Sequence, residues 1–348
     1  MSIPSQRPGW QQALLRAWTG RGVLACALWP ATLAYQALWY ARGLWLARAG
    51  SAPTRLKVPV LVVGNVVAGG SGKTPVVIAL VQRLRANGLA VGVISRGYGR
   101  SPRDVREVHA DSSANAVGDE PVLIQRRCSV PVFVAASRVR AAQALLAAHP
   151  QTQLIVSDDG LQHAALARDL ELGVFDDRGL GNGWMLPAGP LREPWPRRLD
   201  ACLQTRAGLP CAQGFVLQRH LGTRALRADG QTLALATLAQ HATPCVALAG
   251  IAQPEPFFAA LRACGVVLQH TLALADHARL DDLDLSAWAN QPILCTEKDA
   301  VKLWLRHPDA WAVPLHCTLP EAFWRWLGLR LAALGLPAID LTREPPSA

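Results

Sequence analysis

The stretch "NVVAGGSGKTPVV" (65–77) constrains the fold more than any other, because a glycine-rich loop here separates two regular elements. The apolar run Val58–Val63 before it predicts a strand, and the pattern from Lys73 to Asn87 after it predicts a helix. Glycine N–H groups can turn toward phosphate oxygens, and the helix N-terminus adds partial positive charge. The sequence therefore predicts a phosphate-binding loop between a strand and a helix.

This loop carries the core of the GxxxxGK[ST] pattern, with Val67 at the position of the first glycine. In that pattern Lys73 reaches the β- and γ-phosphates, and the Thr74 hydroxyl holds Mg²⁺. An ordinary glycine-rich turn is the alternative, which the flanking strand and helix disfavour. We expect the ATP contacts to come from Ala68, Gly69, Gly70, Ser71, Gly72, Lys73, Thr74 and Pro75.

A second apolar strand, "LIVSDD", ends in two aspartates. A carboxylate at the end of such a strand is typical of the Mg²⁺ anchor that accompanies a phosphate-binding loop. A solvated turn is the alternative, since Asp-Asp-Gly is favourable turn chemistry. We expect Mg²⁺ to be held by Thr74, Asp158 and Asp159, with Gln162 and His163 beside them.

Two other classes of nucleotide-binding protein lack their marker residues here. A guanine-specific GTPase needs an Asn-Lys-x-Asp sequence after a late strand, whereas "TEKD" (296–299) has a different order. Partitioning-type ATPases place a second lysine just before GGxGKT, where this chain has Ala68. A kinase and a stand-alone ATPase remain.

Short apolar strands alternate with helical patterns along much of the chain. Strands are predicted within "LAVGVISRGYG", "PVFVA" (131–135), "QLIVSDDG" (153–160) and "DLELGVFD" (169–176), and "SRVRAAQALLAAH" predicts a helix. Such alternation is typical of a parallel sheet covered on both faces. The predicted fold class is α/β: a P-loop NTPase-like parallel-sheet domain and a second, smaller α/β domain.

We divide the chain into four parts: a helical segment at 1–55, the P-loop kinase domain at 56–213, a β-hairpin linker at 214–240 and the smaller α/β domain at 241–340. The linker rests on strand-like "GFVLQ" and "TLALATL" around the turn-prone "ADGQ". In the smaller domain, "PCVALAGI" predicts a strand and "PEPFFAALRACG" a helix. Residues 177–200, with four glycines and four prolines, predict a long loop of the kind that is often functional.

The N-terminal segment from Val23 to Ala41 contains no charged residue, and arginines flank it on both sides. Five of the twelve tryptophans fall within the first 45 residues, and Trp prefers the membrane–water interface. Because the arginines give no asymmetry between the two sides, we expect a helix or helix pair lying on an anionic membrane surface. A true span and a plain core hairpin are the alternatives.

The net charge and the cysteine spacing limit the classes of binding partner and the cellular compartment that the sequence suggests. The formal net charge of +10 suits an acidic partner, but nearly all of it is arginine in an alanine-rich chain, so it can equally reflect composition. No basic block is interleaved with aromatics, so we expect no nucleic acid. The eight cysteines lie far apart without a CxxC pair, which predicts buried thiols in a reducing, cytosolic compartment rather than a zinc or disulfide framework.

Eight motifs occur in the order in which one family carries them. They are "GNVVAGGSGKTP" (64–75), "SRGYGR" (95–100), "VGDEP" (117–121), "DDGLQH" (158–163), "LPAGPLREP" (186–194), "LAGIAQPEPFF" (248–258), "LADH" (274–277) and "TEKDAVK" (296–302). With the apolar N-terminal segment ahead of them, they make the chain resemble the tetraacyldisaccharide 4′-kinase family, the lipid A 4′-kinases of Gram-negative bacteria.

The resemblance implies a lipid kinase that uses ATP and Mg²⁺. The implied reaction transfers the γ-phosphate of ATP to the 4′-hydroxyl of an acylated glucosamine disaccharide 1-phosphate, giving lipid IVA in lipid A biosynthesis. The implied location is the cytoplasmic face of the bacterial inner membrane, where the acylated substrate resides. We expect a monomer.

The same resemblance implies the catalytic groups. Asp119 of "VGDEP" is the expected base on the 4′-hydroxyl, with His277 of "LADH" as its partner from the second domain, and Lys73 acts on the phosphates. Phosphoryl transfer needs this kind of alignment, charge neutralisation and orientation of the acceptor. The alternatives are a helix N-cap for Asp119 and a surface histidine for His277.

Substrate-binding residues are expected in three of these motifs. They are Arg96, Tyr98, Arg100, His163, Arg192 and Glu193. The first three follow a strand, at the edge where parallel sheets collect ligands, and arginine can bind phosphate through two hydrogen bonds. A flexible basic turn is the alternative there. Lys298 of "TEKDAVK" is a further candidate, whose alternative is a structural ion pair with Glu297 or Asp299.

Two competing functions stay open at this stage. One is a P-loop ATPase that uses hydrolysis as a conformational switch for a membrane or metallocentre partner. The other is a soluble small-molecule kinase, which the apolar segment at 1–55 disfavours. The "LADH" motif and this segment favour the lipid kinase.

Overall fold

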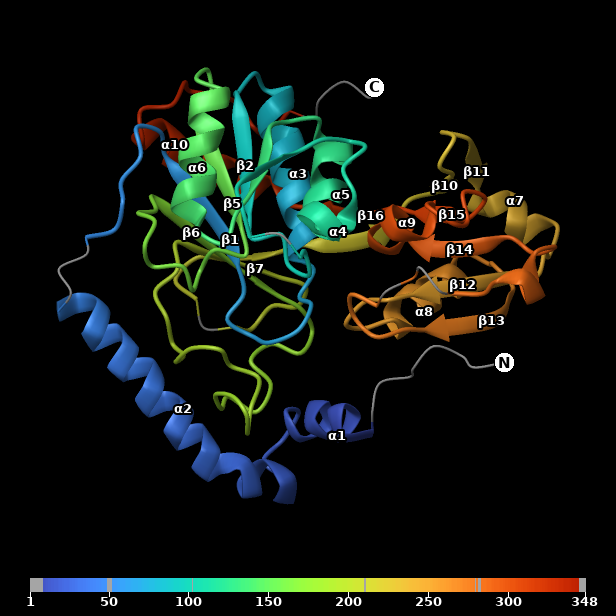
Figure 1. The fold of residues 1–348 in the computed structure, drawn as a ribbon, viewed down its shortest axis with the longest axis horizontal. Helices are drawn as coiled ribbons and strands as arrows, with labels where there is room; N and C mark the ends of the chain where they lie inside the picture. Colours follow the sequence, from blue (N-terminus) through green and yellow to red (C-terminus); the bar gives the residue numbers. More distant parts are fainter. Residues whose placement is uncertain are drawn as a thin grey trace.

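The computed structural model describes residues 9–48, 52–101, 103–209, 211–278, 280 and 283–343. Two α/β domains lie side by side, and two helices extend from the larger one (Figure 1). The α/β fold class is confirmed.

The larger domain is built on a sheet of eight strands in the order β3-β4-β2-β5-β1-β6-β7-β8. All neighbours are parallel except β3, which runs antiparallel to β4. The strands are β1 Val60–Gly64, β2 Val91–Ser95, β3 Arg106–Val108, β4 Val132–Val134, β5 Leu154–Asp158, β6 Leu170–Phe175, β7 Ala201–Gln204 and β8 Gly214–Val216. The central strands are buried on both faces, which explains their continuous apolar sequences. The five strands predicted for this domain are confirmed. The strand-like "GFVLQ" forms β8 at the edge of this sheet, whereas the pattern predicts neither the edge strand β3 nor β7.

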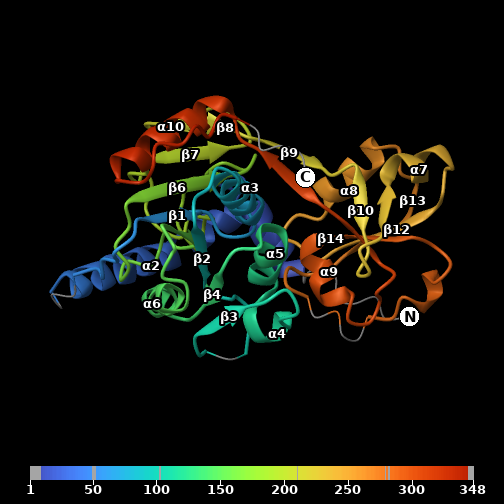
Figure 2. The same ribbon diagram turned by 90° about the horizontal axis from the view of Figure 1, so that it is seen from above.

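Helices cover both faces of this sheet. The α-helices α3 (Lys73–Ala86), α5 (Asp119–Cys128) and α10 (Glu321–Ala333) contribute to one apolar core, and α4 (Ala114–Val117) precedes α5. The opposite core contains α6 (Arg138–Ala148) and the long loop that follows β6. Figure 2 shows α3 and α5 on one side of the sheet and α6 on the other.

The smaller domain has a six-stranded sheet in the order β11-β10-β15-β14-β12-β13. Its strands are β10 Arg224–Leu226, β11 Thr232–Ala234, β12 Cys245–Ala249, β13 Leu268–Ala273, β14 Ile293–Thr296 and β15 Trp311–Val313. Its helical elements are α7 Leu235–Gln240, α8 Glu255–Ala263, the 3₁₀ turn η1 Ser286–Trp288 and α9 Glu297–Leu303. The helices α7 and α8 share one core, and α9 belongs to the other. The strand and helix predicted at 244–264 are confirmed.

The expected boundaries of the linker and the smaller domain are wrong. β8 joins the large sheet, and β10 pairs with β11 inside the smaller sheet, so no single hairpin forms the linker. The chain crosses between the domains twice, and the crossing strands β9 (Gln218–Leu221) and β16 (Leu315–Thr318) pair antiparallel. After the second crossing, α10 packs on the larger domain rather than the smaller one.

Phe323 of α10 gives a direct test of this packing. Its side chain is fully buried in the larger domain's core and contacts Phe215 edge-on, with ring centroids 5.3 Å apart. Phe323→Ala should therefore lower the free energy of unfolding by about 3–5 kcal/mol, measured by urea denaturation. Leu329→Ala on the same helix, 74% exposed, is the control. Equal effects of the two substitutions would contradict the placement of α10.

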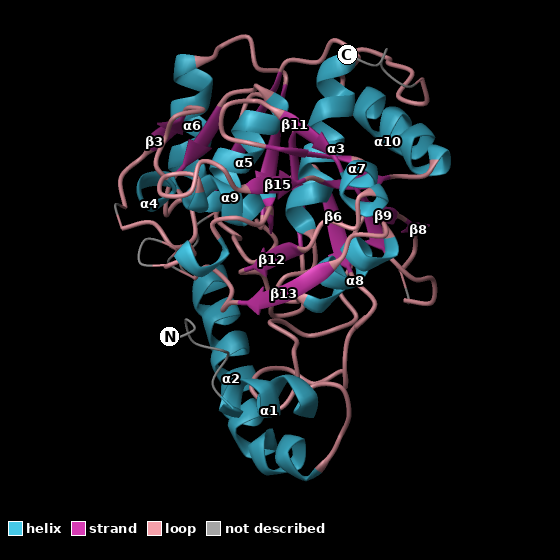
Figure 3. Cartoon of the chain, turned by 90° about the vertical axis from the view of Figure 1, so that its right-hand side faces the viewer, coloured by secondary structure: helices cyan, strands magenta, loops and turns pink. Residues whose placement is uncertain are grey.

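The N-terminal segment forms α1 (Gly9–Ala17) and α2 (Val23–Arg48), which project away from both sheets (Figure 3). In the described ranges, no helix is both long enough and apolar enough to cross a bilayer. α2 is nevertheless apolar and exposed, with Leu38 71% and Trp45 68% accessible. One side of it is attached to the long loop, because the Thr32 hydroxyl donates to the Met185 carbonyl and the Tyr35 hydroxyl donates to the Arg192 carbonyl.

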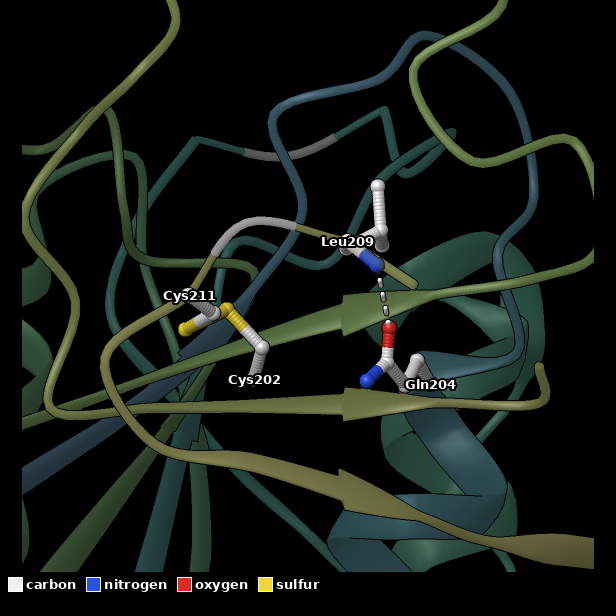
Figure 4. Close-up of a disulfide and its surroundings, with 4 residues drawn as sticks. All are labelled: Cys202, Gln204, Leu209 and Cys211. Atoms are coloured by element: carbon white, nitrogen blue, oxygen red, sulfur yellow. Dashed lines mark hydrogen bonds between the residues drawn. A yellow bond between two sulfur atoms is a disulfide. The ribbon is translucent and has the colours of Figure 1, made fainter. Parts of the chain in front are cut away.

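The expectation that the cysteines are free thiols is wrong for one pair. Cys202 of β7 and Cys211 form a disulfide across the loop that leads to β8, with Cα atoms 6.2 Å apart (Figure 4). In the same loop, the backbone N–H of Leu209 donates to the Gln204 side chain. The parallel pairing of β7 and β8 folds this loop back on itself, which sequence spacing alone does not show. Cysteine spacing therefore no longer supports a reducing compartment.

Candidate active site

The glycine-rich loop leads from β1 into α3, and its glycines are required by the backbone. Gly69 has φ 93° and Gly72 has φ 71°, in the left-handed region that favours glycine. A Cβ at Gly72 would also lie 2.5 Å from the guanidinium carbon of Arg219. α3 begins at Lys73, so the positive end of the helix faces the loop.

Two arginines bind backbone carbonyls of this loop. Arg178, from the loop after β6, donates to the Gly70 carbonyl at 2.7 Å, and Arg219 of β9 donates to the Ser71 carbonyl at 2.5 Å. In a trans peptide, the C=O and the following N–H point in opposite directions. Because the two arginines bind these carbonyls, the N–H groups of Ser71 and Gly72 point away from the arginines and keep their donors for another partner.

The start of the loop is used differently from the expectation. The Ala68 N–H donates to the Pro190 carbonyl at 2.7 Å, and the Val67 N–H donates to the Asn65 side chain at 2.7 Å. These amides are engaged by the protein itself, so the missing first glycine at Val67 costs no phosphate contact. The Ala68 amide is thus engaged by the Pro190 carbonyl, and the expected contact of Ala68 with ATP stays a prediction.

The two aspartates lie directly beside the loop, because β5 pairs with β1 and Val63 lies opposite Asp158. Asp158 is buried, accepts a hydrogen bond from Ser95 at 3.3 Å, and has a second carboxylate oxygen to which no described residue donates. Burial, together with repulsion from Glu120 and Asp159, raises the pKa of Asp158 above its ordinary value. Arg138 supports this turn by donating to the carbonyls of both aspartates.

Asp159 has a different environment from Asp158. Its φ of 50° is unusual for a residue other than glycine, and such backbone strain is concentrated at functional sites. Its carboxylate lies 3.4 Å from Lys73 and 3.5 Å from Arg192. Burial alone would raise the pKa of Asp159, but these cations outweigh it and hold the pKa below its ordinary value.

The residues around these aspartates fit Mg²⁺. Within the described ranges no cluster of three His, Cys, Asp or Glu side chains could hold a metal without help. Mg²⁺ bound with a nucleotide, however, needs only one or two carboxylates, a hydroxyl and phosphate oxygens. Asp158, Asp159 and Thr74 supply that set, and the unpartnered oxygen of buried Asp158 marks a place for a cation. The amide of Gln162 instead donates to the Asn65 carbonyl and to Glu193, so it supports the long loop.

The expected catalytic pair meets across the domain interface. Asp119 is the first residue of α5 and is buried, and its Oδ2 lies 3.1 Å from Nδ1 of His277 in the smaller domain. The helix cap is Gly118, so Asp119 is not the N-cap. His277 has φ 60°, a strained value for histidine. Tyr98 lies against its ring, with centroids 4.7 Å apart.

A lysine that sequence reasoning missed completes the environment of Asp119. Lys302 of α9 lies 3.1 Å from its Oδ2. Burial would raise the pKa of Asp119, but the hydrogen bond with His277 and the charges of Lys298 and Lys302 hold it well below its ordinary value. The carboxylate is therefore ionised and borders a cavity of about 230 Å³. That cavity is lined among others by Tyr98, Asn115, Asp119, His277, Leu280 and Lys302.

Of the residues expected to bind substrate, some lie at this site and others have different partners. Tyr98 lines the cavity, and Arg192 reaches Asp159. Arg96 is exposed, whereas Arg100 is turned into its own loop, where it donates to the Asp104 carbonyl. His163 accepts a hydrogen bond from the Arg138 N–H, and buried Glu193 pairs with Arg197 at 2.8 Å, so both hold the scaffold.

Sequence reasoning missed four further charged side chains that contact the loop or the aspartates: Arg138, Arg178, Arg219 and Lys302. The lysine had a usable signal, because Lys298 and Lys302 are four residues apart and would share one face if the segment were helical. The three arginines had no such sequence signal, because the chain contains many arginines. Arg178 comes from an irregular loop, Arg219 from the crossing strand β9 and Arg138 from the start of α6.

Comparisons with known proteins show which family this chain belongs to. Residues 24–332 match the family model described as tetraacyldisaccharide-1-P 4′-kinase. A tetraacyldisaccharide 4′-kinase of Acidovorax sp. (strain JS42) is 52% identical over 96% of this chain and 98% of its own length. Another, of Verminephrobacter eiseniae, is 54% identical over 90% of this chain and 75% of its own. A crystal structure of LpxK from Aquifex aeolicus in complex with ATP has a TM-score of 0.76 and 25% identity, covering 90% of this chain and 99% of that one. The chain belongs to the tetraacyldisaccharide 4′-kinase family.

Proposed function

We propose that this chain transfers the γ-phosphate of ATP to the 4′-hydroxyl of a tetraacyldisaccharide 1-phosphate, giving lipid IVA. The observation that carries the proposal is the 3.1 Å contact between Asp119 and His277, which joins the two domains beside a phosphate-binding loop. A switch ATPase needs only water as acceptor. A buried carboxylate that opens into a cavity at the domain interface suits a larger acceptor.

The loop and its neighbours would hold the phosphates. Lys73 would neutralise charge on the β- and γ-phosphates, and Arg192, 3.5 Å from Asp159, would help to place the γ-phosphate. Bound at Thr74, Asp158 and Asp159, Mg²⁺ would supply charge neutralisation at the bridging phosphate oxygens.

Asp119 would act on the acceptor. Its ionised carboxylate accepts a hydrogen bond from the 4′-hydroxyl and takes its proton as the oxygen bonds to the γ-phosphorus and the bond to ADP breaks. A low pKa suits this role, because the phosphoryl-transfer transition state is loose and the hydroxyl needs orientation more than early deprotonation. His277 holds the carboxylate in place from the other domain.

The test is incorporation of label from γ-³²P-ATP into tetraacyldisaccharide 1-phosphate in detergent micelles, separated by thin-layer chromatography. We expect a labelled lipid that depends on both Mg²⁺ and the protein. ATP turnover without labelled lipid would contradict the kinase and favour the switch ATPase.

We also propose that α2 docks on the anionic cytoplasmic face of the inner membrane, where the lipid substrate lies. The exposed apolar residues of α2 support this, because burying apolar surface contributes about 25 cal/mol per Å². The hydrogen bond from Tyr35 to the Arg192 carbonyl connects this helix to the loop beside the carboxylates. Docking there would place the 4′-hydroxyl within reach of the site.

Leu38 tests the docking. Leu38→Glu should weaken binding to vesicles of phosphatidylethanolamine and phosphatidylglycerol by about tenfold or more, since one buried leucine contributes roughly 1.5–3 kcal/mol. Sedimentation of the protein with the vesicles measures it. Leu329→Glu is the matched control, because Leu329 is 74% exposed on α10. Equal binding of the two variants would rule out α2 as the docking surface.

A further inference from the structure

Lys298 lies at the centre of a group of charged side chains that no catalytic role yet explains. It is the second residue of α9, and its Nζ lies 3.1 Å from Nε2 of His277, 3.0 Å from Oδ1 of Asp276 and 3.3 Å from Oε1 of Glu120. The side chain is 15% exposed. Since Glu120 belongs to α5 and the other two to the smaller domain, Lys298 contacts both domains and the catalytic histidine at once.

The chemistry of an ammonium group limits what this contact can be. An ammonium has three donors and no acceptor, so toward Nε2 it can only donate to the ring's lone pair. The ring's single proton must then lie on Nδ1, which is 3.1 Å from Oδ2 of Asp119. We propose that Lys298 is a positioning residue that fixes His277 in the neutral form protonated on Nδ1, so that the histidine donates to Asp119 while that carboxylate receives the acceptor hydroxyl.

The surroundings keep Lys298 charged for this task. Burial would lower the pKa of Lys298, but Glu120, Asp119 and Asp276 outweigh it and raise the pKa above its ordinary value. The polar groups that contact His277 are Asp119 from α5, Tyr98 from the loop after β2, Asp276 from its own loop and Lys298 from α9. Lys302 of α9 contacts the Asp119 carboxylate instead. The two ammonium groups favour the ionised form of the Asp119 carboxylate.

A purely structural role for Lys298 would be a latch between the domains, and the chain offers a matched control. Glu297, the preceding residue of α9, pairs with Arg127 of α5 at 2.6 Å and so joins the same two helices. It has no recorded contact with His277 among the described residues. A latch effect should appear in Glu297→Gln, whereas an effect on the histidine should not.

The first test reads the tautomer directly, by ¹⁵N NMR of the full chain labelled at histidine, with the His277 signal assigned by its loss in His277→Ala. We expect His277 to carry its proton on Nδ1 in the wild type, in Glu297→Gln and in Lys298→Arg, which keeps the charge and donors. In Lys298→Met we expect the Nδ1 form to lose its dominance. A proton on Nε2 in the wild type or in Lys298→Arg would overturn the proposal, as would an unchanged spectrum in Lys298→Met.

The second test reads the consequence for lipid phosphorylation and rests on the proposed function. Lys298 is one of the cations that favour the ionised Asp119 carboxylate, so in Lys298→Met the acid limb of kcat/KM should move toward higher pH. Glu297→Gln should leave that limb in place, and Lys298→Arg should restore it. A uniform loss at every pH in Lys298→Met would contradict the proposal. The expected tautomer without any lipid phosphorylation would refute the proposed function and leave the inference about His277 intact.

Discussion

Asp119→Asn should lower kcat/KM for phosphoryl transfer to the lipid by about 10²–10⁴-fold. Asparagine keeps the shape of the side chain but cannot take the acceptor proton, and it leaves Lys302, 3.1 Å away, without its anionic partner. The KM for ATP should change little, because we expect the nucleotide contacts to come from the loop at 68–75. Steady-state kinetics at saturating Mg²⁺ measures both quantities.

The same substitution should also affect stability, with a defined pH dependence. Because the folded-state pKa of Asp119 lies well below its ordinary value, its ionisation stabilises the fold above the unfolded pKa of about 4. That contribution is lost as the pH falls through the folded pKa. Asp119→Asn should therefore lower the Tm at pH 7 and make less difference in strong acid. Asp284→Asn, at an exposed site, is the control for this stability effect.

For the kinetic prediction, an Asp119→Asn protein whose kcat/KM stays within tenfold of the wild type would exclude Asp119 as the base.

Lys73→Met should reduce transfer by about 10³-fold and also raise the KM for ATP. Lys73 is the first residue of α3, is mostly buried, and lies 3.4 Å from Asp159, so its charge is held where phosphate oxygens and Mg²⁺ would meet. Removing one preorganised positive group from such a site typically costs 10²–10³ in rate, and weaker phosphate binding adds to that. Titration with ATP at several Mg²⁺ concentrations separates the two effects.

Lys57→Met is the matched control for this substitution, because Lys57 is exposed and precedes β1. It removes the same charge from the same chain without touching the loop, and its kinetics should equal those of the wild type. A Lys73→Met protein that keeps more than about a tenth of the wild-type rate would contradict the assignment of the loop to ATP.

Much of the larger domain could be predicted from sequence because its information is local. The buried strands β1, β2 and β5 are continuous apolar runs, and the strand–loop–helix at 58–87 carries its own backbone requirements in Gly69 and Gly72. The glycine-rich loop and the two aspartates were expected to form one phosphate and metal site. The observed pairing of β1 with β5 agrees with this, because it places the ends of these two strands side by side.

The features that the sequence did not predict depend on contacts between distant segments. α10 has the apolar pattern of any amphipathic helix, and only the second crossing of the chain decides which domain it covers. The disulfide needs the parallel pairing of β7 with β8 to bring Cys202 and Cys211 together. The arginine that fixes the Ser71 carbonyl comes from a crossing strand, so no motif includes it.

In the candidate active site, too, some residues could be predicted from sequence motifs and others depend on contacts between distant segments. Resemblance supplied Asp119 and His277, and the structure places them 3.1 Å apart from two domains. The structure also adds Lys302, and it shows the contacts of the sequence candidate Lys298; both depend on how α9 packs on α5. Arg100, by contrast, lies in a motif expected to bind substrate, but its guanidinium donates to the Asp104 carbonyl instead.

The account depends most on Asp119 and His277 acting as one unit on the acceptor hydroxyl. A double-mutant cycle with Asp119→Asn, His277→Ala and the double variant, measured as kcat/KM for lipid phosphorylation, tests this directly. Since His277 acts through Asp119, we predict that the double variant is no slower than Asp119→Asn alone. Two losses that multiply would show independent roles for the residues and contradict the account.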